Sequence, residues 1–312
     1  MSGLNEFPLG EFQLIDWIRQ RAAPHLQVPV GIGDDAAVLT PTAGEEVLVT
    51  TDMLMDGRHF IVGKTPPELI GRKALAVNLS DIAAMSGRPL AAFISWALPR
   101  HTGRDLAQSL YAGMAELAKS FDVAIAGGDT NSWDGPLVIS VTLVGETVER
   151  RRILRSGARP GDFIFVTGPL GGSLGGRHLT FTPRVREALD LAQRIEISSM
   201  LDLSDGIASD LRQILNQSGV GATLEARSIP VHADVDHILA ESERLHRALT
   251  DGEDFELLFT ASPAEAKQLL AHPPQGWRPI HVGMIDTQPG CRIRTENGVE
   301  ALPPGGWEHS ID

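Results

Sequence analysis

The chain has 312 residues, 42% of them hydrophobic and 21% charged, a composition that excludes a disordered or fibrous protein and leaves room for about two domains. Its formal net charge of -13 argues against a nucleic-acid partner, because such binding depends on neutralising phosphates with lysine and arginine. A single cysteine, Cys291, excludes an intramolecular disulfide or a cysteine-based metal site within the chain, and it fits a reducing cytoplasm.

No segment of the sequence predicts export or membrane insertion. The N-terminal stretch carries acids at Glu6 and Glu11 and lacks a basic region ahead of an apolar core, so we expect no signal peptide. The best apolar stretch, residues 89–99, is too short to span a membrane and lies between Arg88 and Arg100. We therefore expect a cytoplasmic protein without a membrane partner.

Helical and strand-like segments alternate through both halves of the chain, which predicts a mixed α/β or α+β fold with two domains, each a mixed sheet with helices. The N-terminal half predicts helices over 11–22, 65–85 and 104–120, and strands over 36–39, 47–51, 91–98, 123–126 and 137–145. The C-terminal half predicts helices over 183–194, 206–217 and 263–271, and strands over 163–167, 222–226 and 256–260. An arginine-rich segment ending in Pro160 and Gly161 separates the halves, so we place the domains at 1–150 and 151–312.

Aspartates recur beside glycine, serine or threonine, mostly where a predicted strand ends. The motifs are Gly31–Asp35, Thr50–Asp52, Asn78–Asp81, Gly127–Thr130, Asp202–Gly206 and Asp251–Asp254. Each motif alone fits a turn or a helix cap. Together they predict a phosphate site with several divalent cations, because Mg²⁺ prefers carboxylate oxygens and glycine lets a phosphate approach the backbone.

Several other features allow more than one interpretation. Residues 171–175 match the G-x-S-x-G turn of serine hydrolases at Ser173, but the predicted strand ends at Thr167, several residues too early for that turn. His59 beside Arg58 is either solvated or an anion contact. Trp307 follows two glycines and either packs the C-terminal tail or stacks on a flat ligand.

Taken in order, the motifs resemble those of the thiamine-monophosphate kinase family, a member of the aminoimidazole ribonucleotide synthetase superfamily. The matching segments are GIGDDAAV from Gly31, TTDMLMDGRHF from Thr50, KALAVNLSDIAAM from Lys73, GGDT from Gly127, LRSGARPGD from Leu154, VTGPLG from Val166, DLSDGIASDL from Asp202 and GEDFELLF from Gly252. The ordered set covers nearly the whole chain and is far more specific than any one motif.

The resemblance implies an enzyme that uses ATP and several Mg²⁺ ions to phosphorylate thiamine monophosphate to thiamine diphosphate by direct in-line transfer. It implies a homodimer whose N-terminal sheets form a shared β-barrel. Domain 1–150 would carry metal binding, ATP binding and dimerisation, and domain 151–312 would complete the active-site cleft.

The resemblance also assigns roles to individual residues. The implied magnesium ligands are Asp35, Thr50, Thr51, Asp52, Asp81, Asp129, Asp202 and Asp205, with Asp34 as a further candidate. The implied ATP contacts are Gly128, Asp129, Arg155 and Ser204, and the implied substrate contacts are His59, Glu253 and Trp307. No acid or base catalyst is implied. Asp251 stands where the family pattern predicts a glycine, which bears on the substrate loop.

Two alternatives to this function remain open from the sequence. One is another ATP-dependent enzyme of the same superfamily, such as aminoimidazole ribonucleotide synthetase. Selenophosphate synthetase and the hydrogenase-maturation enzyme are disfavoured, because each would place a reactive cysteine near a chain terminus and Cys291 lies at neither. The other alternative is a non-catalytic regulatory dimer that binds nucleotide.

Overall fold

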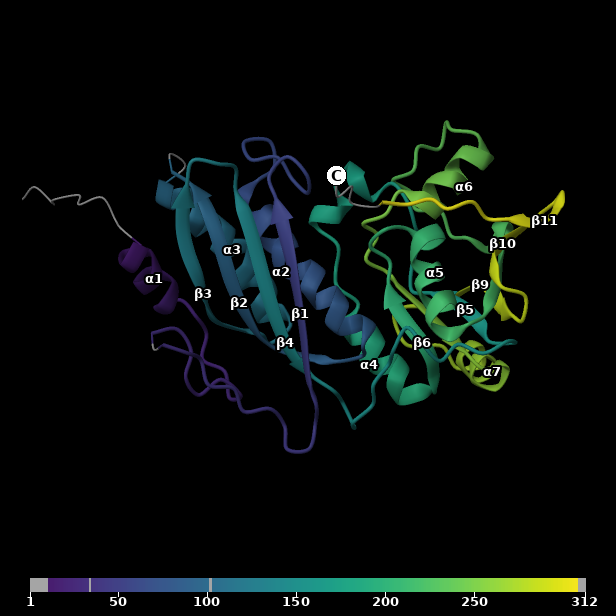
Figure 1. Ribbon diagram of the computed structural model, residues 1–312, viewed down its shortest axis with the longest axis horizontal. Helices are drawn as coiled ribbons and strands as arrows, with labels where there is room; N and C mark the ends of the chain where they lie inside the picture. Colours follow the sequence, from purple (N-terminus) through teal and green to yellow (C-terminus); the bar gives the residue numbers. More distant parts are fainter. Residues whose placement is uncertain (1–10, 34, 101–102, 308–312) are drawn as a thin grey trace, which may run out of the picture. The chain divides into compact units, whose positions relative to one another are not determined.

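The computed structural model describes residues 11–33, 35–100 and 103–307, which form two compact units (Figure 1). Unit 1 comprises Met1–Asn78 and Pro89–Glu146, and unit 2 comprises Leu79–Arg88 and Thr147–Asp312. The sequence-based division has one boundary near residue 150, whereas the chain also contributes a short earlier segment to unit 2.

Unit 1 is built on a four-stranded sheet of order β1-β4-β2-β3, in which β1 and β4 are antiparallel and β2 and β3 are parallel. Figure 1 shows α2 and α3 on one face of this sheet. The elements are α1 Glu11–Arg19, β1 Val47–Met55, α2 Pro67–Ala84, β2 Arg88–Pro99, α3 Gly103–Ser120, β3 Ala124–Trp133 and β4 Val138–Glu146, of which the end of α2 belongs to unit 2.

Helices α2 and α3 touch backbone to backbone at two glycines. A Cβ atom on Gly71 would lie 1.9 Å from the carbonyl oxygen of Leu110, and one on Gly113 would lie 1.8 Å from that of Glu68. Real Cβ atoms essentially never approach other atoms so closely, so any side chain at either position would force the helices apart.

The two faces of strand β1 differ in exposure. Leu54 is buried, whereas Val47, Val49 and Met53 on the opposite face are 52%, 64% and 57% exposed. Side chains alternate between the faces of a strand, so this edge strand presents an uncovered apolar surface.

A buried carboxylate ties the loop before β1 to the sheet. Glu146, at the end of β4, has no exposed surface and accepts hydrogen bonds from the backbone N–H of Thr42 at 2.7 Å and from its hydroxyl at 2.8 Å. The side-chain amide of Gln27 also donates to it, at 3.3 Å. These bonds fix the loop that carries the Gly31–Asp35 motif.

Unit 2 is built on a seven-stranded mixed sheet of order β11-β10-β7-β9-β5-β8-β6, in which only the β10–β7 pair is parallel. Its core holds fully buried aliphatic side chains from the sheet and from α5, including Ile164, Val166 and Leu211. The elements are β5 Phe163–Val166, η1 Ser173–Gly175, η2 Arg177–Leu179, α4 Val185–Arg194, β6 Ile197–Asp202, α5 Ile207–Ser218, β7 Gly221–Glu225, η3 Ala226–Ser228, α6 Glu241–Thr250, β8 Leu257–Ala261, α7 Pro263–Ala271, β9 Ile280–Asp286, β10 Gly290–Thr295 and β11 Gly298–Ala301.

These two sheets with their helices confirm the predicted mixed α/β class. The predicted strand over 36–39 is wrong, because only an isolated bridge between Val30 and Val38 forms there. Helix α6 and strands β6, β9, β10 and β11 were not predicted. In β6 the polar Ser199 is buried, and its hydroxyl bonds to that of Thr260 at 2.7 Å. Within the described ranges, no helix is long and apolar enough to cross a membrane.

The glycine contact between α2 and α3 yields a stability prediction. Gly113→Ala should destabilise the protein by about 3 kcal/mol or more, because the added methyl meets backbone that cannot rotate away. The melting temperature, measured by calorimetry, should fall by about 6 °C or more, since each kcal/mol is worth about 2–4 °C at this domain size. The control is Gly175→Ala, where a Cβ meets no atom within 4 Å. Equal melting temperatures for the two variants would contradict this account of the helix contact.

Candidate active site

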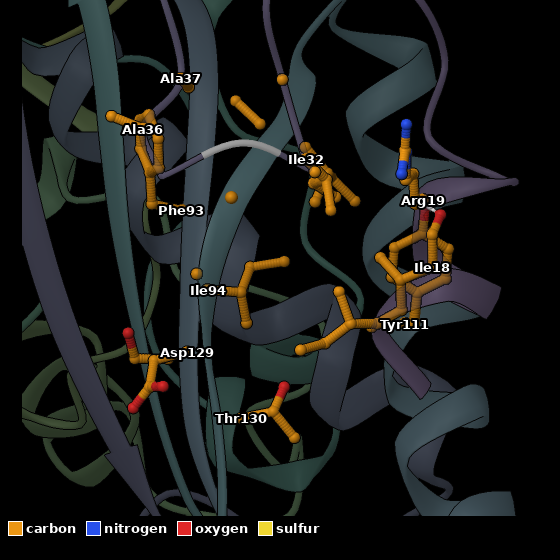
Figure 2. A pocket seen from close by; sticks show the side chains of 18 of the residues that line it. Ile18, Arg19, Ile32, Ala36, Ala37, Phe93, Ile94, Tyr111, Asp129 and Thr130 are labelled. Carbon is orange, nitrogen blue, oxygen red and sulfur yellow. Dashed lines mark hydrogen bonds between the residues drawn. The ribbon is translucent and has the colours of Figure 1, made fainter. Parts of the chain in front are cut away.

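Unit 1 contains a pocket of about 970 Å³ that brings three of the sequence-predicted residues together, namely Asp35, Gly128 and Asp129. Figure 2 shows Asp129 on the strand side of the pocket, with Arg19 and Tyr111 across from it. Gly128 has a φ of 150°, and a Cβ there would lie 1.8 Å from the carbonyl oxygen of Ile94, so only glycine fits. Asp34 lies outside the described residues.

The predicted ligands on β1 lie away from this pocket. Strands β1 and β3 are opposite edges of the sheet, so three strand spacings, about 14 Å, separate the strand that carries Asp52 from the strand that carries Asp129. Thr50 and Asp52 share the half-buried face of β1, whereas Thr51 is on the exposed face, where its hydroxyl lies 3.1 Å from that of Thr142. Unit 1 therefore does not gather these side chains around one ion.

The prediction that aspartates follow strands holds for one of these motifs only. Asp202 is the last residue of β6, but Asp52 and Asp129 lie inside strands that continue beyond the predicted ends, and Asp81 lies within α2. Strands β1 and β3 extend further because their polar residues still form ladder hydrogen bonds, which the side-chain pattern does not reveal.

In unit 2 two of the predicted acids, Asp202 and Asp205, lie at the turn between β6 and α5. The carboxylate of Asp202 accepts a hydrogen bond from the hydroxyl of Ser80 at 2.7 Å. Ser80 directly precedes Asp81, so this bond brings the turn close to the Asn78–Asp81 motif. Ser204 and Asp205 follow in the turn itself. The structure thus joins the Asn78–Asp81 and Asp202–Gly206 motifs, which lie about 120 residues apart.

Asp210, which the sequence analysis did not single out, lies beneath this turn. Its buried carboxylate accepts a hydrogen bond from the backbone N–H of Asp205 at 3.0 Å. Burial, together with the charges of Asp205 and Asp202, raises the pKa of Asp210 to about 8, and the charge of Arg155 opposes the rise. The turn is therefore a site of crowded negative charge that also lies within electrostatic reach of Arg155.

The backbone of the same turn holds both predicted substrate residues of unit 2. The carbonyl of Ser204 accepts a hydrogen bond from the N–H of Glu253 at 2.6 Å, and that of Asp205 accepts one from the N–H of Trp307 at 3.1 Å. Gly306 has a φ of 107°, and a Cβ there would lie 2.2 Å from the Asp205 carbonyl oxygen. The indole of Trp307 is 53% exposed, so it is not buried as a packing anchor within unit 2.

The glycine-rich loop after β5 is fastened to the 251–254 segment. Asp251, where the family pattern predicts glycine, accepts a hydrogen bond from the N–H of Gly172 at 2.9 Å. Asp254 accepts one from the N–H of Gly171 at 3.0 Å. The buried hydroxyl of Ser173 donates to the carbonyl of Glu253 at 2.6 Å. Ser173 therefore has a structural hydrogen bond and does not stand on the exposed turn of a serine hydrolase.

His59 in unit 1 has a defined tautomer. Its Nδ1 accepts a hydrogen bond from the N–H of Met55 at 3.0 Å, so the ring proton is on Nε2. Its carbonyl accepts a hydrogen bond from the ammonium of Lys73 at 3.1 Å, and Lys73 has no exposed surface. Lys73 stands in one of the family motifs, but the sequence does not reveal that it positions the His59 loop, because its partner lies 14 residues earlier.

The predicted ligands are of the chemical type that binds Mg²⁺, but they do not by themselves form a complete coordination shell. Carboxylate and hydroxyl oxygens are the ligands that Mg²⁺ prefers, and the neighbouring charges of Asp202 and Asp205, which raise the pKa of Asp210, favour a cation. Among the residues that the structure describes, no group of three or more His, Cys, Asp or Glu side chains is placed to hold a metal. Mg²⁺ commonly takes one or two carboxylates and completes its shell with water and substrate phosphates, and this donor set suits that pattern.

Comparison with known proteins first defines the class. The family model described as "AIR synthase related protein, N-terminal domain" matches residues 33–147, which lie mostly in unit 1.

The relatives narrow the class further. A thiamine-monophosphate kinase of Rhodopirellula baltica is 39% identical, covering 95% of this chain and 96% of its own. The crystal structure of thiamine-monophosphate kinase from Stenotrophomonas maltophilia matches with a TM-score of 0.79 and 35% identity, over 91% of this chain and 96% of its own. A structure described as AaThiL complexed with AMPPCP and TMP matches with a TM-score of 0.75 and 29% identity, over 99% of both chains. The chain belongs to the thiamine-monophosphate kinase family.

The buried carboxyl of Asp210 yields a prediction about pH. Between its ordinary pKa of 3.8 and its folded pKa of about 8, the folded state retains a proton that the unfolded state has lost, so stability falls as pH rises. Asn at this position cannot ionise. In excess chelator, the melting temperature of Asp210→Asn relative to the unmutated protein should therefore rise by several degrees between about pH 5 and about pH 8.5.

Calorimetry at the two pH values measures this difference directly. The control is Asp190→Asn, which alters a partly exposed carboxylate that pairs with Arg194 on α4. If the difference in melting temperature between Asp210→Asn and the unmutated protein is the same at both pH values, the Asp210 carboxyl ionises normally in the folded state.

Proposed function

We propose that this chain transfers the γ-phosphoryl group of ATP to thiamine monophosphate and so produces thiamine diphosphate. The observation that carries the proposal is whole-chain similarity, at 29% identity over 99% of both chains, to a structure described as complexed with AMPPCP and TMP. AMPPCP is an ATP analogue, and TMP has the initials of thiamine monophosphate, the phosphoryl acceptor of this kinase family. The single turn at Ser204 and Asp205, which holds both Glu253 and Trp307, supports the same function.

We assign the substrate contacts by chemistry. Thiamine monophosphate joins a cationic thiazolium to an aminopyrimidine and an anionic phosphate. The exposed indole of Trp307 offers an aromatic face to the cation, an attraction worth about 0.5–2 kcal/mol. The carboxylate of Glu253 would accept a hydrogen bond from the amino group, and the Nε2–H of His59 would donate to the phosphate. The nucleotide contacts are Gly128, Asp129, Arg155 and Ser204.

The reaction needs little acid–base help from the protein. The nucleophile is a phosphate oxygen that is already ionised at neutral pH, so no strong general base is required. The protein must instead align two anions and offset their repulsion, which is strong at low dielectric. Direct in-line transfer follows, without a phosphorylated side chain as an intermediate.

Magnesium, when bound, would supply positive charge that offsets the negative charge of the phosphates during transfer. We assign its protein ligands to Asp35, Thr50, Thr51, Asp52, Asp81, Asp129, Asp202 and Asp205. The geometry of unit 1 divides this set, because Asp129 faces the 970 Å³ pocket and Asp52 lies at the other edge of the sheet. Loss of either carboxylate should therefore impair activity separately.

Incubation of the protein with ATP, Mg²⁺ and thiamine monophosphate, followed by mass detection of thiamine diphosphate, tests the function. Asp129→Asn should lower kcat/KM on the order of a hundredfold or more, because metal stabilisation of a transferring phosphoryl group is worth several kcal/mol. Asp190→Asn, a change of the same kind outside the site, should stay within about twofold. Full activity in excess chelator, or no product from the unmutated protein, would contradict the proposal.

We further propose that the active protein is a homodimer whose N-terminal sheets form a shared β-barrel. The support in this chain is the uncovered apolar face of β1, an edge strand with Val49 64% and Met53 57% exposed. Edge strands of this kind normally pair or are covered. The buried Cys291, the only cysteine of the sequence, supports a reducing cytoplasmic location.

The double variant Val49→Glu, Met53→Glu should convert the dimer to a monomer, because charge would replace apolar area at the interface. Light scattering should then give the chain mass of 33.6 kDa, instead of twice that value for the unmutated protein. Leu270→Glu, at an exposed apolar position of α7, is the matched control and should remain dimeric. An unmutated protein at 33.6 kDa would refute the dimer.

A further inference from the structure

The segment that carries Glu253 has an unusual backbone. Glu253 and Phe255 both have a φ of 52°, in the left-handed region that non-glycine residues seldom occupy, and Gly252 before them has a φ of 71°. Such conformations persist where the surroundings impose them, and they concentrate at functional sites. A side chain displayed by this backbone is held in one place.

Three hydrogen bonds impose the conformation. The N–H of Glu253 bonds to the carbonyl of Ser204 at 2.6 Å, and that of Phe255 bonds to the carbonyl of Leu203 at 2.8 Å. From the other side, the hydroxyl of Ser173 donates to the carbonyl of Glu253 at 2.6 Å. The backbone of Glu253 is therefore fixed, and only the direction of its carboxylate remains to be set.

That direction is set by a residue that neither the motifs nor the resemblance identified. Nδ1 of His178 lies 2.9 Å from Oε2 of Glu253, with the two side chains 13% and 22% exposed. An ionised carboxylate only accepts, so the imidazole Nδ1 carries the proton and donates. A half-buried, charge-assisted hydrogen bond of this length restrains both groups.

His178 itself is on a firmly held segment. It lies in η2, next to Arg177, whose guanidinium donates to the carbonyl of Gly171 at 2.8 Å and to the buried carboxylate of Asp254 at 2.9 Å. Arg177 also pairs with Asp234 at 3.0 Å. The network holds the backbone of η2 through Asp234 on one side and through Asp254 on the other, so the imidazole of His178 is presented to Glu253 from a fixed position.

We propose that His178 is a positioning residue that orients the Glu253 carboxylate toward the exocyclic amino group of the phosphoryl acceptor's pyrimidine. His178 thereby determines specificity for an amino-substituted base without touching the phosphates. The inference rests on the proposed function, since it names how that site recognises its acceptor.

The test compares three variants on two acceptors. The acceptors are thiamine monophosphate and its analogue with a carbonyl oxygen in place of the exocyclic amino group. An Asn amide nitrogen reaches the position of Nδ1, whereas a Gln amide reaches that of Nε2. His178→Gln should therefore raise KM for thiamine monophosphate roughly 5- to 20-fold, and His178→Asn should keep it within about threefold. His272→Gln, at an exposed histidine, is the matched control.

The preference for thiamine monophosphate over the carbonyl analogue is measured as the ratio of their kcat/KM values. This ratio distinguishes a His178 that positions Glu253 from a His178 that only supports the fold. This ratio should fall in His178→Gln and fall no further in the double variant His178→Gln, Glu253→Gln than in Glu253→Gln alone. KM for ATP should stay within about twofold in His178→Gln. If that variant does not fold, the ratio in Glu253→Gln and in His178→Ala decides the question.

The outcomes are distinct. The inference alone is overturned if the unmutated protein is active and His178→Gln has the same ratio of kcat/KM for the two acceptors. Where His178→Gln does not fold, the ratio in His178→Ala is compared instead. A rise of both KM values together with a lower melting temperature and an unchanged ratio also overturns the inference. An unmutated protein without kinase activity overturns the proposed function, and this inference with it.

Discussion

The arrangement of unit 2 depends on the main-chain carbonyls of one turn, at Leu203, Ser204 and Asp205. They accept hydrogen bonds from the N–H groups of Phe255, Glu253 and Trp307 respectively. Two segments that are about 50 residues apart are thereby fastened to the same three residues. The metal and nucleotide roles proposed above fall on the side chains of this turn, whereas its backbone carbonyls hold the two segments.

Crowded negative charge is the second constraint on this turn. Asp210 is buried beneath it, and with Asp202 and Asp205 it forms a group whose mutual repulsion raises the Asp210 pKa further than burial alone. A chain of net charge -13 that handles two phosphate compounds would repel both of them unless cations intervene. The charges of Asp202 and Asp205, which help to keep Asp210 protonated at neutral pH, therefore also favour a divalent metal at this turn.

Much of the fold could be predicted because, within the described residues, six of the seven α-helices and seven of the eleven strands carry clear periodicity; α6, β6, β9, β10 and β11 were not predicted. Helix α7 was predicted at the bounds it has, and β4, β5, β7 and β8 were each predicted within one residue. Strand β6 was missed because a buried hydrogen bond between Ser199 and Thr260 satisfies hydroxyls that a pattern counts as polar. The ends of β1 and β3 were misplaced because ladder hydrogen bonds continue through Asp52 and Asp129.

The ordered motifs identified the family, but the residues that support the site could not be found that way. Lys73 and His178 each act through a partner that the folded chain brings close, and no short motif records such a pairing. Asp210 stands in the same motif as its partner Asp205, but the motif does not show that its carboxylate is buried. Asp251 shows the converse case. It departs from the family pattern, and only the folded chain shows that its carboxylate accepts a hydrogen bond from the N–H of Gly172 and so fastens the loop.

The central claim is that catalysis proceeds by positioning and electrostatics in one in-line step, with no covalent intermediate on the protein. The buried, hydrogen-bonded hydroxyl of Ser173 agrees with this claim. The most direct measurement is the stereochemistry of transfer from an ATP analogue that carries an isotopically chiral γ-thiophosphate. A single in-line displacement predicts inversion at phosphorus in the thiamine product. Retention would require two displacements through a phosphorylated residue and would contradict the account.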